Sequence, residues 1–280
     1  MRGWLGLNAG ARALLGLARV RLAPVAEGTR CGARSLGGVL VLSVGLWLGA
    51  GMVAEAASCA QVRLGQPSDE YGHRVLGTEG EYKAILAAAP EGALTPMLRL
   101  APGRVFEDVG VRCADLDGDG ALEIVVVEST LEAGARILVL RQDGLRLSEY
   151  AATPPIGQRN RWRGIAAVGD LDGDGRLEIA EVDRPHLAGI LRFWRLEDGG
   201  SGAALHEIAA VSGYSNHRIG QDFITAAVRD CGSGAELILP DFAWQALQAV
   251  RLRGDAVAAR STDLPADHTG LARALDCEAS

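Results

Sequence analysis

An acidic segment that occurs twice constrains the fold of this chain more than any other feature. It reads Ala-Asp-Leu-Asp-Gly-Asp-Gly-Ala-Leu-Glu-Ile at 114–124 and Gly-Asp-Leu-Asp-Gly-Asp-Gly-Arg-Leu-Glu-Ile at 169–179. A shortened copy occupies 229–238, and a stub remains at 274–278. Such self-similarity indicates a repeat architecture, in which each unit buries its apolar surface against the next.

Short apolar runs flank each copy in the same order. The runs are rich in Val, Ile and Leu and are bounded by Gly, Asp and Pro, which is typical of β-strands. First strands are expected at 109–114, 164–168, 224–228 and 271–275, second strands at 124–127, 177–180 and 237–239, third strands at 137–144, 191–196 and 249–254, and fourth strands at 145–150, 204–211 and 256–260.

Repeated units of four strands predict an all-β fold, a small β-propeller of about four four-stranded blades. The alternative is a ring of five blades, with the fifth built from residues 60–80. Residues 270–276 supply only a first strand, whereas 81–88 and 94–100 resemble the later strands of a unit that lacks its first. We therefore expect a single domain over 57–280, closed by pairing of its N- and C-terminal strands, which would leave no open sheet edge.

The first 56 residues have the pattern of an export signal. Six arginines lie within residues 1–34, no charge occurs between Ser35 and Ala54, and Ala54-Glu55-Ala56 forms an A-x-A cleavage site. This pattern predicts a signal peptide over 1–56. The alternative is an uncleaved membrane anchor, since twenty uncharged residues could span a bilayer. Either alternative places the rest of the chain in the periplasm or outside the cell, with no other integral membrane domain.

The charge balance excludes two classes of partner. The chain carries 28 basic and 35 acidic residues, for a net charge of −7, and six of the basic residues lie in the expected leader. The remainder is more acidic still, which argues against nucleic acid and anionic membrane surfaces as partners.

Four cysteines follow the expected leader, Cys59, Cys113, Cys231 and Cys277. An even number in an exported protein allows two disulfides. Cys231 and Cys277 each follow the anchoring aspartate of successive units. We therefore expect them on neighbouring blades, close enough to pair.

The two full acidic segments have the spacing of calcium loops. Carboxylates at positions 1, 3, 5 and 9, with a backbone carbonyl at position 7, let one tight turn supply most of the oxygens that Ca²⁺ needs, and the glycines let the backbone wrap the ion. The expected ligands are Asp115, Asp117, Asp119, Ala121 and Glu123 in the first loop, and Asp170, Asp172, Asp174, Arg176 and Glu178 in the second.

Two alternatives compete with this interpretation. An EF-hand needs flanking helices and an acid at position 12, which is Val126 in the first loop and Glu181 in the second. A solvated acidic turn without metal is the other. The third copy has lost the acids between Asp230 and Glu236 and is not expected to bind an ion.

The sequence Asp-Leu-Asp-Gly-Asp-Gly-x-Leu-Glu-Ile between two expected strands resembles the FG-GAP/VCBS repeat of integrin-α-type propellers. The resemblance extends over about 105–262. It implies that calcium lies between the first and second strands of a blade, at two sites, and that the ion is structural.

The loops on the other side of the blades gather residues suited to recognition. Aromatic, basic and acidic side chains concentrate there, whereas the turns beside the acidic loops lack this mixture of side chains. Propeller mouths commonly bind ligands; the alternative is that these residues cap strands and hold the blades together. The expected ligand-face residues are Glu107, Asp108, Arg161, Trp162, Arg184, His186, His217, Arg218 and Asp222.

Two functions are compatible with these patterns. The favoured one is an exported, calcium-stabilised binding module for a protein or a carbohydrate. The rival is a secreted or periplasmic hydrolase or lyase that uses Glu107, Asp108, His217 and Asp222 on the calcium-free face. The sequence lacks a zinc-protease spacing, a nucleophile elbow, a P-loop and a dinucleotide fingerprint, so the residue types favour binding over catalysis.

Overall fold

The computed structural model describes residues 59–77, 80–88, 92–199 and 202–278, which fall within one compact unit, residues 52–280. The expected signal peptide or anchor, residues 1–56, lies outside the described residues. In the part that is described, no helix has the length and apolar character needed to cross a membrane.

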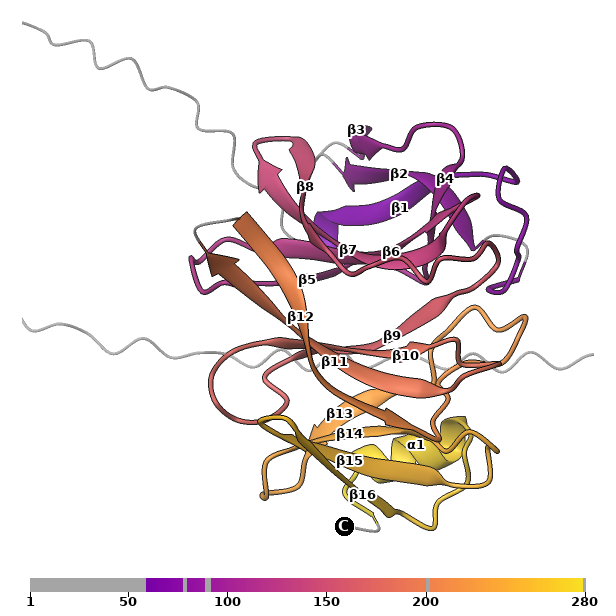
Figure 1. Ribbon diagram of the computed structural model, residues 1–280, viewed down its shortest axis with the longest axis vertical. Helices are drawn as coiled ribbons and strands as arrows, with labels where there is room; N and C mark the ends of the chain where they lie inside the picture. The colour runs from indigo at the N-terminus through magenta and orange to yellow at the C-terminus, as the bar shows by residue number, and fades with distance from the viewer. Residues whose placement is uncertain (1–58, 78–79, 89–91, 200–201, 279–280) are drawn as a thin grey trace, which may run out of the picture. The chain divides into compact units, whose positions relative to one another are not determined.

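Antiparallel β-sheets dominate the described residues, which confirms the all-β prediction (Figure 1). The first sheet has the strand order β1-β2-β4-β6-β7-β8, with β3 paired to β2 and β5 paired to β6. Its strands are β1 (Val62–Pro67), β2 (Glu81–Ala88), β3 (Leu94–Arg99), β4 (Arg104–Glu107), β5 (Arg112–Ala114), β6 (Glu123–Thr130), β7 (Gly134–Asp143) and β8 (Arg146–Ala152).

Two four-stranded sheets follow, each a simple meander. The second sheet comprises β9 (Arg163–Gly169), β10 (Glu178–Asp183), β11 (Ile190–Gly199) and β12 (Gly202–Ser212), and the third comprises β13 (Ala227–Asp230), β14 (Ala235–Pro240), β15 (Leu247–Arg253) and β16 (Ala256–Ser261). The four-strand units expected around the second and third copies of the repeat are therefore present. In the first sheet two short strands share one edge of β6, because β4 and β5 pair with its opposite ends.

Two apolar clusters of the described residues lie between successive sheets. Val127 and Ile137 of the first sheet pack with Ile165 and Ile179 of the second. Leu191 and other residues of the second sheet form a further cluster with Leu237, Leu239 and Val250 of the third. Strands β6, β10 and β14, which follow the three copies of the repeat, are buried on both faces. This burial explains their aliphatic residues. This packing sets the loops of adjacent sheets beside one another.

The C-terminal segment corrects one expectation. Residues expected to form the first strand of a shared blade form a helix, α1 (His268–Leu275), instead. Asp267 caps it by accepting a hydrogen bond from the N–H of Gly270, and the Leu-Ala-Arg-Ala-Leu sequence that follows has high helix propensity. The partners of β2 are β1, β3 and β4. Closure by pairing of 270–276 with 80–88 is therefore wrong.

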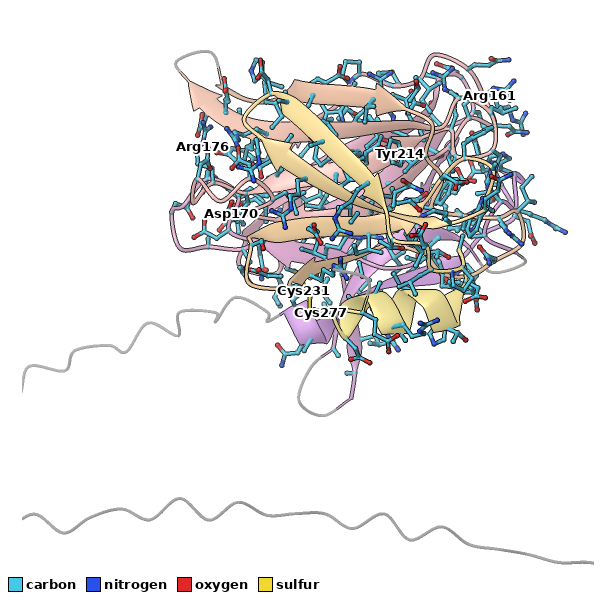
Figure 2. All side chains as sticks on the ribbon, turned by 90° about the horizontal axis from the view of Figure 1, so that it is seen from below. Arg161, Asp170, Arg176, Tyr214, Cys231 and Cys277 are labelled. Carbon is cyan, nitrogen blue, oxygen red and sulfur yellow. A yellow bond between two sulfur atoms is a disulfide. The ribbon has the colours of Figure 1, made fainter. Side chains whose placement is uncertain are left out.

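Helix α1 packs against the third sheet. Its Ala274 is fully buried in a cluster with Ile238, Leu247 and Leu264. A disulfide joins Cys231, in the turn after β13, to Cys277, just beyond the helix (Figure 2). The two cysteines expected to pair are bonded, but within one sheet and its helix rather than between neighbouring blades.

A second disulfide, Cys59–Cys113, links the segment before β1 to β5. Both bonds tie residues far apart in the sequence, 54 and 46 positions for the N-terminal and C-terminal pair respectively. Two disulfides in a chain of this size fit an oxidising compartment.

Candidate metal loops and ligand pocket

The acidic loops after β5 and β9 are built in the same way. In each, the first aspartate accepts a hydrogen bond from the second glycine of the loop: Asp115 from Gly120 at 3.0 Å and Asp170 from Gly175 at 3.1 Å. The glycines occupy the left-handed backbone region, with φ of 89° at Gly120 and 87° at Gly175, which a side chain would strain. The repeated sequence thus folds twice into the same turn.

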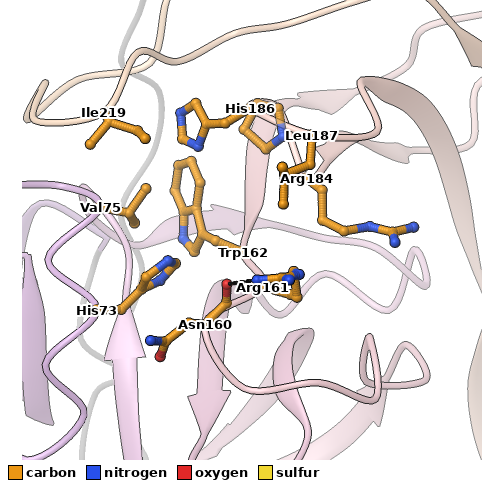
Figure 3. A pocket seen from close by; sticks show the side chains of 10 residues that line it. His73, Val75, Asn160, Arg161, Trp162, Arg184, His186, Leu187 and Ile219 are labelled. Carbon is orange, nitrogen blue, oxygen red and sulfur yellow. Dashed lines mark hydrogen bonds between the residues drawn. The ribbon is translucent and has the colours of Figure 1, made fainter.

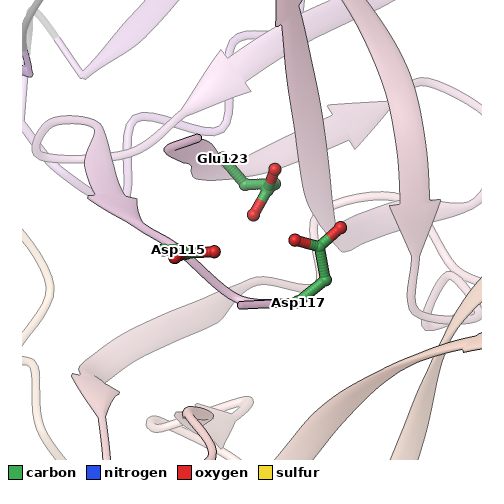
Figure 4. Close-up of side chains that lie close together, drawn as sticks. All are labelled: Asp115, Asp117 and Glu123. Carbon is green, nitrogen blue, oxygen red and sulfur yellow. The ribbon is translucent and has the colours of Figure 1, made fainter. Parts of the chain in front are cut away.

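Three carboxylates converge in each loop. Oxygens of Asp115, Asp117 and Glu123 lie within 4.8 Å of one another (Figure 4). Oxygens of Asp170, Asp172 and Glu178 form the equivalent group in the second loop. These six of the expected ligands therefore come together as the spacing indicated.

The remaining expected ligands lie at the outer part of the turns. Asp119 and Asp174 are half-exposed and accept hydrogen bonds at 2.8 Å from the backbone N–H groups of Ala121 and Arg176 respectively. Neither aspartate belongs to the group of three. The two outer acids thus complete the turn rather than adding to the convergent oxygens.

The convergent groups have the chemistry of a hard-cation site. Glu123 and Glu178 are fully buried, and burial raises the pKa of each carboxyl. Among the described residues, Asp115 Oδ1 and Glu123 Oε1 are buried without a hydrogen-bond partner. Buried carboxylate oxygens at this spacing, without hydrogen-bond partners, suit Ca²⁺, which binds through oxygen atoms. The residues present therefore fit the ion that the motif implies.

An arginine from the third strand of the same sheet approaches each group. Arg141 lies across from Glu123 in β7 and forms an ion pair with Asp117. Arg195 occupies the equivalent place in β11, opposite Glu178, and bonds both Glu178 and Asp172. These arginines partly neutralise carboxylates that would otherwise repel one another.

The third copy, between β13 and β14, replaces acids with guanidinium groups. Glu236 keeps the position of Glu123 and Glu178, but Arg229 stands directly opposite it, where the other sheets have Ala114 and Gly169. The Arg229 guanidinium is buried and lies 2.8 Å from the Glu236 carboxylate. Arg251 and Arg260 also contact Glu236, at 2.9 and 3.2 Å.

A family comparison agrees with this geometry. Residues 115–180, which span the first loop to the start of the second sheet's β10, match the model of the FG-GAP-like repeat. The chain carries an FG-GAP-like repeat. No curated protein matches the chain. The matched stretch of the FG-GAP-like repeat includes both groups of three carboxylates, and strands rather than helices flank both loops, so the EF-hand alternative is wrong.

Replacement of Arg141 by glutamine is expected to raise the affinity of the first FG-GAP loop for calcium by about tenfold, since a fixed positive charge a few ångströms away opposes a divalent cation. The metal-free protein should at the same time melt at a lower temperature, because Asp117 loses its ion-pair partner. Calorimetric calcium titration measures the first effect. Arg251→Gln, at the equivalent place in the third sheet, is the matched control and should leave the titration unchanged. Equal calcium affinity in Arg141→Gln and the unaltered protein would contradict the expected competition.

Loops on the opposite side of the sheets enclose a pocket of about 290 Å³. Figure 2 shows Asp170 and Arg176 at one side of the sheets and Arg161 at the other. Four of the expected ligand-face residues line this pocket: Arg161, Trp162, Arg184 and His186 (Figure 3).

The other expected ligand-face residues lie elsewhere. Glu107 and His217 have no exposed surface and stand behind the pocket. Asp108 and Asp222 line a second hollow of about 490 Å³, and Asp108 is bonded to Arg112 at 2.7 Å. The guanidinium of Arg218 stacks on the Trp244 ring at 4.4 Å. The sequence predicted one ligand face for all nine residues. In the structure, four line the pocket, two are buried behind it and three lie outside it.

Two buried hydrogen-bond chains support the pocket wall. His73 Nδ1 lies 2.7 Å from Glu107, which also accepts from the Ser129 hydroxyl at 2.5 Å. His186 Nε2 lies 3.0 Å from Nδ1 of His217, whose own Nε2 donates to the Gln221 carbonyl at 2.9 Å.

The hydrogen bonds of the second series determine which ring nitrogen of His186 carries the proton. Because a carbonyl only accepts, His217 Nδ1 is the acceptor and His186 Nε2 carries the hydrogen, which leaves His186 Nδ1 as an acceptor. Burial lowers the pKa of His186 to about 4, so the ring is neutral near pH 7.

Sequence reasoning missed His73 and Asn160, which also line the pocket. His73 lies in the connection between β1 and β2, far from any repeat, and no local pattern marks it. Asn160 occupies the left-handed region, with φ of 55°, and its N–H donates to the Tyr71 hydroxyl at 2.8 Å. Asparagine tolerates this conformation better than most residues, which is the one available signal.

Proposed function

We propose that this protein is an exported, calcium-stabilised, propeller-type binding module, and that its ligand docks on the side opposite the acidic loops. The observation that carries the proposal is the pair of convergent carboxylate groups, three acids in each. In the first group, two buried oxygens lack a hydrogen-bond partner among the described residues. The FG-GAP-like repeat match supports the same assignment. Residues 115, 117 and 123, and 170, 172 and 178, would hold the ions, which would neutralise the acids and stiffen the turns.

Contacts between sheets explain how such ions would act beyond their own loops. The Tyr150 hydroxyl lies 2.9 Å from Asp117 and 2.7 Å from Asp198, which belongs to the second sheet. In the next pair of sheets, the N–H of Gly254 donates to Asp172 at 3.3 Å. The second acidic loop therefore contacts the β15–β16 turn of the third sheet directly, and the first is linked to β11 of the second sheet through Tyr150. Ordering a loop with calcium would order the junction between sheets.

The composition of the pocket favours binding over catalysis. The described residues that line it include no Ser, Thr, Cys, Asp or Glu, so it offers neither a hydroxyl, thiol or carboxylate nucleophile nor the two carboxylates of a glycosidase. The enzymatic alternative narrows to proton abstraction by a histidine, and His73, oriented by Glu107, is the residue placed for it.

The proposal is tested by melting the purified protein in EDTA and in calcium. An ion that binds only the folded state at 100 times its dissociation constant adds about 2.7 kcal/mol, which corresponds to a rise of about 5–10 °C for a domain of this size. The double variant Asp115→Asn with Asp170→Asn should lose the rise. Asp230→Asn, the same change at the anchoring aspartate of the third copy, should keep it. A rise that persists in the double variant, or that is absent from the unaltered protein, would count against calcium at these loops.

A further inference from the structure

Four chain segments meet to form the pocket opposite the acidic loops. They are the connections β1–β2, β8–β9, β10–β11 and β12–β13, which contribute His73, Asn160, Arg184 and Ile219 among others (Figure 3). Arg184, like Asn160, has a left-handed backbone, with φ of 50°, held by a hydrogen bond from its N–H to the Trp162 carbonyl at 2.9 Å. Residues held in such conformations cluster at ligand sites. At about 290 Å³ the pocket has room for one ring and its substituents.

Arg161 supplies a positive charge that is left for a ligand. Its guanidinium makes one hydrogen bond within the described residues, from Nη1 to the Asn160 carbonyl at 2.9 Å, and no ion pair among them. Since a guanidinium has five N–H donors, several remain. Arg184, the other cation of the pocket, is already bound by the Asp183 carboxylate at 2.8 and 3.0 Å.

The charge of the site matches one carboxylate. No acid lines the pocket among the described residues, and one guanidinium of the two lacks a counter-ion. A planar guanidinium pairs in two-pronged fashion with a planar carboxylate. A phosphate monoester, with nearly twice the charge, would leave about one negative charge uncompensated.

The pocket also contains neutral hydrogen-bond acceptors, which a hydroxyl on the same ligand could satisfy. The side-chain oxygen of Asn160 is buried and has no hydrogen-bond partner among the described residues. Nδ1 of His186 is an acceptor, because the hydrogen of the ring is held at Nε2 by the contact with His217. Two acceptors without donors are satisfied by a ligand that donates, and a hydroxyl is the simplest such group.

The rest of the lining is apolar. Val75 and Trp162 are 3% and 2% exposed and form the buried wall. Leu187 and Ile219, at 63% and 74% exposure, form an apolar rim. Side chains of this kind pack against the face of a ring.

We propose that this pocket binds a small ring compound that bears a single carboxylate and at least one hydroxyl. The carboxylate pairs with Arg161, the hydroxyl donates to Asn160 or His186, and the ring lies against Trp162 and the apolar rim. This inference rests on the proposed binding function and names its ligand class. Sugar acids and hydroxylated aromatic acids share the chemistry.

The test uses two acids and their neutral counterparts as probes. Glucuronate and glucose represent the sugar source, and 4-hydroxyphenylacetate and its amide represent the aromatic source. Titration calorimetry on the calcium-loaded protein should show that at least one acid binds about tenfold or more tightly than its neutral counterpart, as expected for a charge-assisted pair. The pair that shows the difference identifies the source. No binding of either acid up to about 10 mM, or equal binding of acid and neutral probe, would overturn the proposal.

Matched variants separate the specific pair from general electrostatics. Arg161→Gln should weaken binding of the acid about tenfold or more and leave the neutral probe unchanged. Arg218→Gln removes the same charge from the same side of the protein, outside the pocket, and should change the affinity less than about twofold. Equal losses in both variants would overturn the assignment of Arg161.

Melting curves of the same samples report the calcium loops independently. A calcium shift without acid binding overturns only the ligand class. Acid binding without a calcium shift overturns only the role of calcium. Arg161→Gln should melt with the unaltered calcium shift, because Arg161 lies on the opposite side of the sheets from Asp170 of the second acidic loop (Figure 2).

Discussion

Replacing Arg163 with methionine is expected to lower the free energy of unfolding by about 3–5 kcal/mol. Arg163 and Glu181 form an ion pair in which the side chains are 6% and 0% exposed. Without the guanidinium, the Glu181 carboxylate keeps one hydrogen-bond partner among the described residues, the Trp194 indole N–H at 3.2 Å. Arg163 also donates to the Pro154 carbonyl of the chain leading from the first sheet, at 3.1 Å, so the change loosens a junction between sheets. Urea unfolding followed by fluorescence measures the loss.

Two further variants make this expectation specific. The double change Arg163→Met with Glu181→Leu should recover most of the lost stability, because an apolar pair can replace a buried ion pair. Arg273→Met removes an arginine from an exposed pair with Glu278, in which the side chains are 49% and 50% exposed, and should cost less than about 1 kcal/mol. A double variant no more stable than Arg163→Met would show that the loss arises from packing or the Pro154 contact rather than from an unpaired charge.

Removal of the C-terminal disulfide by Cys231→Ser with Cys277→Ser is expected to cost about 4 kcal/mol. The bond closes a loop with a sequence separation of 46, and the chain entropy released in the unfolded state sets this magnitude. Helix α1 should be affected first, because the bond is one of its few attachments to the third sheet. The hydrogen bond from Arg229 to the Ala274 carbonyl, at 2.6 Å, would still connect the helix to the sheet.

Chemical unfolding and amide hydrogen exchange together check the disulfide prediction. Exchange should accelerate in α1 and change little in β9–β12. The variant Cys59→Ser with Cys113→Ser is the control, since it opens a loop of similar length at the other end of the described residues. Unchanged exchange in α1 of the first variant would mean that apolar contacts and Arg229 hold the helix without the disulfide.

The acidic loops could be predicted from the sequence because their chemistry is local. Asp115, Asp117 and Glu123 are brought together by one tight turn, so spacing along the chain determines spacing in space. The arginines opposite them could not be predicted in this way. Arg141 is distant from Glu123 in sequence, and their contact depends on the register between β6 and β7. An arginine in an alternating strand has the pattern of a solvent-facing residue.

The C-terminal helix shows a limit of repeat reasoning. The stub 274–278 resembles the start of another unit, and a short apolar run such as 271–275 is compatible with a strand or with a helix. The deciding signal was the capping residue Asp267 followed by good helix formers. The stub shares only its aspartate and cysteine with the third copy of the repeat, which is too little similarity to predict a strand.

The pocket could be predicted in outline and not in detail. The side of the sheets on which it lies follows from the strand order, and four of its residues were expected. His73 comes from the β1–β2 connection, which has no repeat counterpart, and only tertiary packing places it in the wall of the pocket. The burial of Glu107 is likewise decided by long-range contacts, with His73 and Ser129.

The guanidinium of Arg229 differs from a bound ion in one respect that reaches beyond its own sheet. A cation carried by the chain is present at fixed stoichiometry, whereas a dissolved ion obeys mass action and leaves when the medium is dilute in it. Under the proposed assignment, the last sheet therefore has a rigidity set once, at synthesis, while the two preceding sheets stiffen or soften with the calcium content of their surroundings. The third sheet would then have constant rigidity, whereas the rigidity of the first two sheets, whose loops form the walls of the pocket, would depend on the calcium concentration.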